Sequence, residues 1–144
     1  MPRRDEGLDE VEAWAATCVR RVGEVACALP EVREEDAWVG VRWRIRTTTF
    51  AHVYPIRDGR PQGSAAVAGI AEPAVVMTFR APAAEAEAFA HLGPPWFKPP
   101  WSATACGLVL DAGTDWAEVA EVVTDSYRLK APKRLVRGLD PPAT

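Results

Sequence analysis

The sequence lacks most of the features that mark a membrane protein or a metalloprotein. No apolar run approaches the roughly 18 residues that a transmembrane helix needs. The charged start of the chain is not followed by an apolar secretory segment. The two histidines, His52 and His91, are too few and too scattered to build a zinc site with the cysteines. We therefore expect a cytoplasmic protein that has no membrane segment, no metal and no cofactor.

Cysteine is also scarce. Cys18, Cys27 and Cys106 show no CxxC spacing, and their neighbours in the sequence are apolar. Cysteines in such surroundings are usually core residues rather than disulfide partners or metal ligands. We expect three buried free thiols.

Recognisable catalytic motifs are missing. The chain has no GxSxG, P-loop or GxGxxG motif, and its serine, histidine and aspartate residues form no nucleophile arrangement. Asp111, Asp115 and Glu118 lie close together in the sequence, but the end of a strand and the cap of a helix account for them. We therefore expect a protein that is not an enzyme.

The hydrophobic residues predict one domain that contains both helices and strands. A length of 144 residues with 48% hydrophobic content fits a single domain over 1–144, with its core at about 8–135. Apolar steps of three and four predict helices over 8–28, over 83–91 and onward from the Asp115 cap. Pro30 is expected to end the first helix.

Strands are predicted between these helices. Alternation of apolar and polar residues predicts a strand over 39–45, and further strands are predicted over 49–56, 73–79 and 106–111. A turn at Thr47-Thr48 would join the first two strands, another turn is expected over 57–63, and residues 31–36 are interpreted as an acidic linker. The order and the short connections predict an α+β fold, a two-layer domain with helices packed on an antiparallel sheet.

Basic residues concentrate in two segments although the net charge is −3. Five arginines accompany a single acid, Asp58, over 42–60, and five basic residues occur without any acid over 128–137. Arg42, Arg44 and Arg46 alternate along the predicted strand, which places neighbouring guanidinium groups about 6–7 Å apart on one face. That spacing suits consecutive phosphates of a nucleic-acid strand, and arginine suits bidentate phosphate contacts. The candidate nucleic-acid-binding residues are Arg42, Arg44, Arg46, Arg57, Lys130, Lys133, Arg134 and Arg137.

Simpler interpretations exist for both segments. The arginine strand could be an ordinary solvated face, or helix carboxylates such as those of Glu24, Glu121 or Asp125 could cover it. In the C-terminal segment, Arg128 and Lys130 are close enough to the helix end to offset its dipole. The basic residues beyond Pro132 lie too far from that end, so the sequence leaves open an arm that contacts phosphates.

An aromatic stretch over 93–101 has two interpretations. It holds two tryptophans, one phenylalanine and four prolines around Lys98. Such a stretch is either a stiff loop whose aromatic rings cover the edge of the core, or a platform on which single-stranded bases stack.

Several short motifs, taken in order, resemble one known family. They are ALPEV at 28–32, Trp38 before the arginine strand, GPPWFKPPW at 93–101, and Asp115-Trp116 leading to SYRLKAPKR at 126–134. Together they resemble the MmcQ/YjbR family over about 8–135. The alanine-rich stretch near 63–69 departs from the typical family pattern. The resemblance implies a small bacterial α+β protein, similar to CyaY-like and secretion-chaperone-like sheets, with a DNA-binding role.

Charge and resemblance lead to the same hypothesis. The chain is predicted to bind duplex DNA with weak sequence preference, through the arginine strand and the basic tail. The alternative is a protein-interaction or chaperone-like module without enzymatic activity. In that case the sheet face, or the loop with Trp96, Phe97 and Trp101, would bind a peptide or a second copy of the chain.

Overall fold

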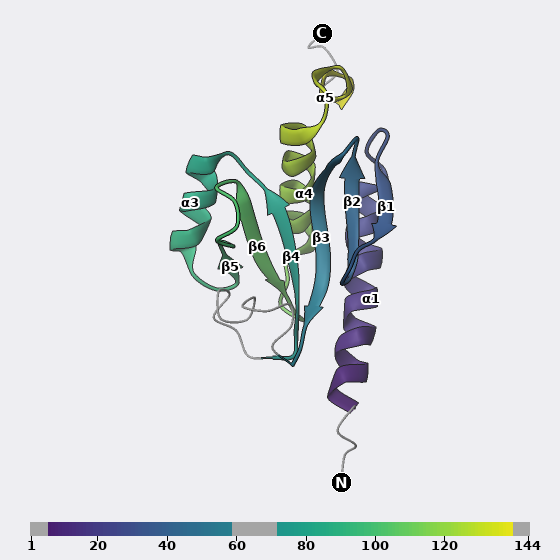
Figure 1. Cartoon of the computed structure of the whole chain (residues 1–144), viewed down its shortest axis with the longest axis vertical. Helices are drawn as coiled ribbons and strands as arrows, with labels where there is room; N and C mark the ends of the chain where they lie inside the picture. The colour runs from purple at the N-terminus through teal and green to yellow at the C-terminus, as the bar shows by residue number, and fades with distance from the viewer. Residues whose placement is uncertain (1–5, 59–71, 140–144) are drawn as a thin grey trace.

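Six strands form one antiparallel sheet, with helices packed against it (Figure 1). The structure is a computed structural model that describes residues 6–58 and 72–139, with side chains from Glu10 onward. The order of strands across the sheet is β1-β2-β3-β4-β6-β5. The strands are β1 (Arg33–Asp36), β2 (Val41–Ile45), β3 (Thr48–Ile56), β4 (Ala74–Arg80), β5 (Trp96–Phe97) and β6 (Ala105–Leu110). The helices are α1 (Glu6–Ala26), α3 (Ala83–Leu92), α4 (Trp116–Lys130) and α5 (Lys133–Leu139). The predicted α+β two-layer fold is confirmed.

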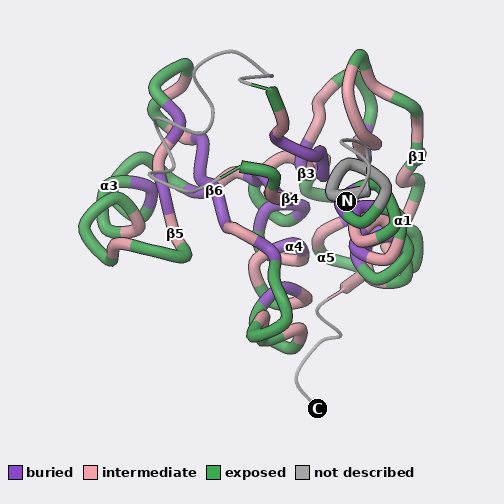
Figure 2. The backbone as a smooth tube through the Cα atoms, turned by 90° about the horizontal axis from the view of Figure 1, so that it is seen from below, coloured by how far each residue is buried: buried purple, intermediate pink, exposed green. Residues whose placement is uncertain are grey.

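The main core lies between the sheet and the helices α1 and α4. Helix α1 buries Val11, Ala15, Cys18 and Val22, which follow the spacing of one helical stripe. Alternate residues of the strands face this stripe, because successive side chains of a strand point to opposite sides of the sheet. Figure 2 shows the buried segments on the central strands and on parts of α1 and α4.

Helix α3 extends the helical layer toward the β5 end of the sheet. The ring of Phe89 lies 5.6 Å from that of Phe79 and 4.7 Å from that of Trp96, centroid to centroid. Phe79 belongs to the main core together with the residues of α1 and α4. Helices α1, α3 and α4 therefore cover one side of the sheet, and within residues 6–58 and 72–139 no helix covers the other side (Figure 1).

A β-bulge near the start of β3 shifts the register of its pairing with β2. Trp43 pairs with Ala51 and Arg44 pairs with Thr49, so Phe50 is one residue more than the ladder needs. The Phe50 ring packs edge-on against Tyr127 of α4 at 5.6 Å. Both aromatic rings are fully buried, so the bulge anchors the hairpin of β2 and β3 to α4.

The two edges of the sheet differ from its centre. Strand β1 consists of four charged residues, three of them exposed. Strand β5 has only two residues and pairs with β6 alone. Neither edge offers a long apolar strand.

Strand β1 corrects one prediction, because residues 33–36 of the predicted linker over 31–36 form a strand, and only Glu31 and Val32 belong to the connection. The sequence Arg-Glu-Glu-Asp has no apolar alternation, so nothing in the pattern signals a strand. Antiparallel pairing with β2 holds it in place, and Glu34 Oε1 accepts a hydrogen bond from Trp43 Nε1 at 2.8 Å. An edge strand needs little core of its own, which is why pattern analysis missed it.

The basic tail has a structure that the sequence did not predict. The basic residues beyond Pro132 belong to helix α5, Lys133–Leu139. The Pro132 carbonyl accepts hydrogen bonds from the N–H groups of Leu135 and Val136, and the Leu135 side chain is buried. The charges of this segment masked a short apolar repeat at Leu135 and Leu139, which packs against the core.

Smaller differences concern a turn and a thiol. The β2–β3 turn is at Arg46 and Thr47, because Ile45 already pairs with Thr48, and Arg46 has a φ of 57°. Cys18 and Cys106 are buried and free as predicted, whereas Cys27 is exposed because α1 ends one residue earlier. The expected turn over 57–63 and the alanine-rich stretch to 72 lie almost wholly outside the described residues.

Candidate nucleic-acid interface

Arg42 and Arg44 lie on the helix-free face of the sheet, as their alternation with Trp43 requires. Strand β1 places Glu35 directly opposite Arg42. The Glu35 carboxylate lies 3.7 Å from Arg42 Nη2 and 3.4 Å from Arg44 Nη1. The Nε atoms of both arginines are buried and have no hydrogen-bond partner in the described part of the chain. The two guanidinium groups thus share one carboxylate and retain unused donors.

Arg46 leaves this row because it lies in the turn. Its Nη2 is 3.3 Å from one oxygen of Glu31, and Nη2 of Arg134 is 3.5 Å from the other oxygen. Glu31 lies in the connection between α1 and β1, and Arg134 lies at the start of α5. The structure therefore brings the hairpin and the C-terminal helix together around one carboxylate.

The remaining tail cations are at the same end of the molecule. Lys133 and Arg137 are exposed on α5, and Lys130 is the last residue of α4 (Figure 1). Among residues 6–58 and 72–139, none of these three makes an ion pair. We define the hairpin–tail surface as Arg42, Arg44, Arg46, Lys130, Lys133, Arg134 and Arg137.

Arg57 lies apart from this surface. It follows the last residue of β3, whereas Arg46 precedes the first, and β3 separates them by roughly 25 Å. Its guanidinium pairs with the Glu12 carboxylate of α1. Arg57 therefore does not belong to the hairpin–tail surface, although the sequence analysis grouped it with Arg42, Arg44 and Arg46. Arg60 lies outside the described residues.

Carboxylates do reach the arginines, but from other positions than expected. Glu31 and Glu35 make the pairs, and both belong to the segment that had been interpreted as a linker. Within the described residues, Glu24, Glu121 and Asp125 make no ion pair with them. These pairs are partly exposed to solvent and contribute about 0–1 kcal/mol each, so a polyanion can compete for the same guanidinium groups.

A groove on the helix-free face was not predicted. It has a volume of about 300 Å³, and its lining includes Trp38, Arg42, His52, Arg80 and Trp101. We call it the sheet-face groove. The sequence pointed to Arg42, Trp38 and Trp101 separately, but the spacing of residues cannot show that they line one groove.

His52 forms part of the groove floor. Burial lowers the pKa of His52 below its ordinary value of 6.5, and the charge of Arg42 lowers it further. The ring is therefore neutral at pH 7. Its Nε2 lies 2.6 Å from the carbonyl oxygen of Val39, which can only accept, so the proton is on Nε2.

In the aromatic stretch over 93–101, two of the rings cover the core and the third is exposed to solvent. Trp96 and Phe97 form β5 and pack into the two hydrophobic clusters. Trp101 is 59% exposed, and Arg80 Cζ lies 5.1 Å from the centre of its ring. The first two rings complete the core, and the third faces solvent beside a cation.

Residues 27–129 match the YjbR family, which is well over half of the sequence. The chain belongs to the YjbR family. Neither a curated protein nor a solved structure was found to match it.

The YjbR match contains the first basic segment, over 42–60, and ends within the second, over 128–137. It includes all six strands, together with α3 and nearly all of α4. Lys130, Lys133, Arg134 and Arg137 lie beyond residue 129, whereas Trp38, Arg42 and the other groove residues lie within the match. The sheet-face groove thus lies within the matched residues, and α5 lies outside them.

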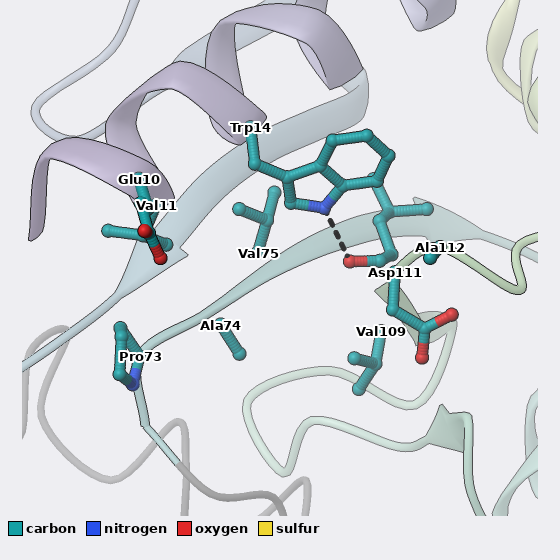
Figure 3. Close-up of a pocket in the computed structure, with 10 residues that line it drawn as sticks. Glu10, Val11, Trp14, Pro73, Ala74, Val75, Val109, Asp111 and Ala112 are labelled. Carbon is teal, nitrogen blue, oxygen red and sulfur yellow. Dashed lines mark hydrogen bonds between the residues drawn. The ribbon is translucent and has the colours of Figure 1, made fainter. Parts of the chain in front are cut away.

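A second hollow of this YjbR chain lies between α1 and the ends of β4 and β6 (Figure 3). It has a volume of about 360 Å³ and is lined largely by apolar side chains. Trp14 Nε1 donates a hydrogen bond to the Leu110 carbonyl at 2.8 Å, and Glu10 and Asp111 supply carboxylates at its margin. Its described lining contains no histidine, cysteine or serine.

Metal and membrane sites were also sought in the described part of the chain. No group of three or more His, Cys, Asp or Glu side chains there is arranged to hold a metal ion. None of its helices is both long enough and apolar enough to cross a bilayer.

Proposed function

We propose that this protein binds nucleic acid, duplex DNA in particular, through phosphate contacts of the hairpin–tail surface. One observation carries the proposal: Arg46 and Arg134 both contact Glu31. Two basic segments that are far apart in the sequence therefore meet in one place. A duplex backbone requires such an extended cationic surface rather than a single charged site.

The charge balance of this surface supports the proposal. Four arginines share only two carboxylates, because Glu35 pairs with Arg42 and Arg44 while Glu31 pairs with Arg46 and Arg134. The three further cations, from Lys130 onward, add positive charge without an ion-pair partner in the described residues. The surface is therefore basic although the chain as a whole carries a net charge of −3.

The binding mechanism is neutralisation of phosphates with release of condensed counterions. Each phosphate that is contacted lowers the log–log slope of affinity against salt by about 0.9. Contacts to phosphates carry no sequence information, so weak sequence preference is expected. The bacterial cytoplasm, where DNA is accessible, is the location that we propose for this activity.

Charge reversal at two positions tests the surface. Fluorescence anisotropy of a labelled 20-base-pair duplex is measured at two salt concentrations for wild type, Lys133→Glu and Arg57→Glu. Lys133→Glu should weaken binding roughly 3- to 10-fold and reduce the salt slope by about 1. Arg57→Glu makes the same change of charge away from the surface and should alter affinity less than about 2-fold. Equal weakening by both variants would show that only the overall charge matters and would refute the surface.

A gain of affinity provides a second test. Glu31→Gln removes the carboxylate that Arg46 and Arg134 share but keeps a side chain of similar size. The two guanidinium groups then become available to phosphates, and duplex affinity at low salt should rise roughly 2- to 10-fold. An unchanged affinity would mean that neither arginine contacts the DNA.

The alternative, a non-enzymatic protein-interaction module, rests on the exposed aromatic side chains. Trp38 is fully exposed and Trp101 is more than half exposed, and such groups often anchor protein partners. Sedimentation of the protein alone separates the two functions, because a stable dimer that persists at high salt would favour the alternative.

A further inference from the structure

A polar row crosses the helix-free face of the sheet. The pairing registers align Arg42 of β2 with His52 of β3 and Thr78 of β4. Neighbouring strands lie about 4.8 Å apart, so this row is about 10 Å long. It forms part of the floor of the sheet-face groove across three strands, and the Phe97 ring covers the next position in the row, Gly107 of β6.

One end of the sheet-face groove is marked by Trp38. The N–H of Ala37 donates to the Gly40 carbonyl at 3.0 Å, which closes a tight turn with Trp38 and Val39 at its tip. Val39 packs against the smaller hydrophobic cluster, and Trp38 is turned out to solvent, with a relative exposure of 104%. Tryptophan is usually well buried on average, so a fully exposed ring at a turn is a surface available for stacking.

The other end of the groove is marked by Trp101 and Arg80. Arg80 Nη1 donates to the hydroxyl groups of Ser102 at 2.9 Å and Thr104 at 3.1 Å. These contacts hold the guanidinium over the Trp101 ring, at 5.1 Å from its centre. Trp101 is still 59% exposed, so the pair offers a stacking surface and a phosphate-binding cation next to each other.

The charge of the groove favours an anion. Its described lining includes Arg42 and Arg80 but no aspartate or glutamate. Glu35 pairs with Arg42 at 3.7 Å, and the Arg42 side chain remains 37% exposed, so a phosphate can reach its guanidinium group. Burial keeps His52 neutral at pH 7, so it can present a flat, uncharged ring to a base.

We propose that the sheet-face groove binds single-stranded nucleic acid, with bases stacked on Trp38 and Trp101 and the connecting phosphates bound by Arg42 and Arg80. This inference rests on the proposed nucleic-acid function and specifies an unpaired strand as its preferred ligand. Uncovered antiparallel sheet faces with aromatic and arginine side chains are a recurrent way to bind such strands. The bases of an intact duplex are stacked on one another, so they cannot stack on the two tryptophan rings.

Matched ligands separate base stacking from charge. Binding is measured for a 12-nucleotide oligothymidylate, an abasic 12-mer with the same phosphates, the 20-base-pair duplex and thymidine monophosphate. Wild-type protein should bind oligothymidylate at least 5-fold more tightly than the abasic strand, because stacking contributes to each base that is held. Equal affinity for the two strands would overturn the proposal. Monophosphate binding as tight as that of the oligomer would indicate a free-nucleotide site and would overturn it too.

Substitutions of Trp38, compared with a control substitution of Leu92, test whether the Trp38 ring stacks on a base. Trp38→Leu should weaken oligothymidylate binding roughly 5- to 150-fold and leave the abasic strand and the duplex within about 2-fold. Trp38→Phe keeps an aromatic face and should retain most of the affinity. Leu92→Ala removes an apolar side chain that is 63% exposed on α3 and should have no effect. Because Trp38 is fully exposed, its replacement leaves the core intact.

Different experimental results would contradict this inference and the proposed function. If Lys133→Glu weakens duplex binding while Trp38→Leu leaves oligothymidylate binding unchanged, the hairpin–tail surface stands and the groove proposal is wrong. If no nucleic acid binds with a dependence on salt, both are wrong. A dimer of the free protein that Trp38→Leu dissociates would assign the groove to a second copy of the chain and overturn the proposal.

Discussion

The hydroxyl of Ser126 donates a hydrogen bond to the backbone carbonyl of Phe50 at 2.6 Å, at the bulge of β3. The same oxygen accepts the N–H of Arg80 at 2.9 Å. One fully buried side chain of α4 therefore joins β3 to the end of β4, where Arg80 enters the sheet-face groove.

Replacement of Ser126 by alanine should destabilise the protein by roughly 2 kcal/mol or more. The variant leaves a buried carbonyl and a partly buried N–H without their partner, and each such group costs about 1–3 kcal/mol. Urea denaturation measures the change in the free energy of unfolding. Thr124→Ala is the control, because the Thr124 hydroxyl only bonds a carbonyl of its own helix, and it should cost less than about 0.5 kcal/mol. Equal effects of the two variants would contradict the role given to Ser126.

Gly107 should not tolerate a side chain. A Cβ atom at this position would overlap the ring of Phe97 on the neighbouring strand. Gly107→Ala should therefore destabilise the protein by about 1–3 kcal/mol. In a double-mutant cycle, the added loss should shrink in a Phe97→Leu background, because a smaller side chain leaves space for the methyl group. Additive effects would show that the two residues do not compete for space.

Stability should depend on His52 in mildly acidic solution. Because burial lowers the pKa of His52 in the folded protein, the unfolded chain takes up its proton first as the pH falls through 6.5. The free energy of unfolding then declines until the pH reaches the folded pKa, by about 1.4 kcal/mol for each unit of depression. His52→Gln should flatten this decline between pH 7 and 5, and the control His91→Gln, at an exposed position, should not. Thermal denaturation over this pH range provides the measurement.

Thiol reactivity should distinguish the three cysteines. Burial raises the pKa of Cys18 to about 12 and that of Cys106 to about 11, and both side chains are buried. A thiol reagent should therefore label one group rapidly in the native protein, and Cys27→Ser should abolish that phase.

The rate of Cys27 labelling should respond to Glu34. Burial and the nearby Glu34 carboxylate raise the pKa of the Cys27 thiol above 9.0, so labelling should accelerate as the pH rises past 9. Glu34→Gln should shift this dependence to lower pH. An unchanged pH profile would mean that Glu34 does not influence the thiol.

The central part of the fold could be predicted from the sequence because its signals are local and apolar. The alternation of Val41, Trp43 and Ile45 gave the face of β2, and the spacing of Val11, Ala15 and Cys18 gave the buried stripe of α1. Elements with charged sequences, β1 and α5, could not be found this way. They are held by contacts with distant residues, such as the hydrogen bond between Trp43 and Glu34.

The candidate site could be predicted only in part. Charge counting found Arg42, Arg44, Arg46 and Arg134, but it placed Arg57 with them, because sequence distance does not reveal which end of a strand a residue occupies. The pairing of Arg46 and Arg134 with one carboxylate depends on the turn after β2 and on the start of α5. The amino-acid composition predicts neither the position of this turn nor the residue at which α5 begins.

The two edges of the sheet have a consequence for assembly. An open sheet with an uncovered face could add further strands from neighbouring molecules, as aggregating proteins do. Here Arg33, Glu34 and Asp36 expose charge along β1, and β5 is too short to template another chain. Association by backbone hydrogen bonding is therefore blocked on both flanks, so encounters with other molecules must go through side chains. Concentrated solutions should accordingly stay free of fibrils.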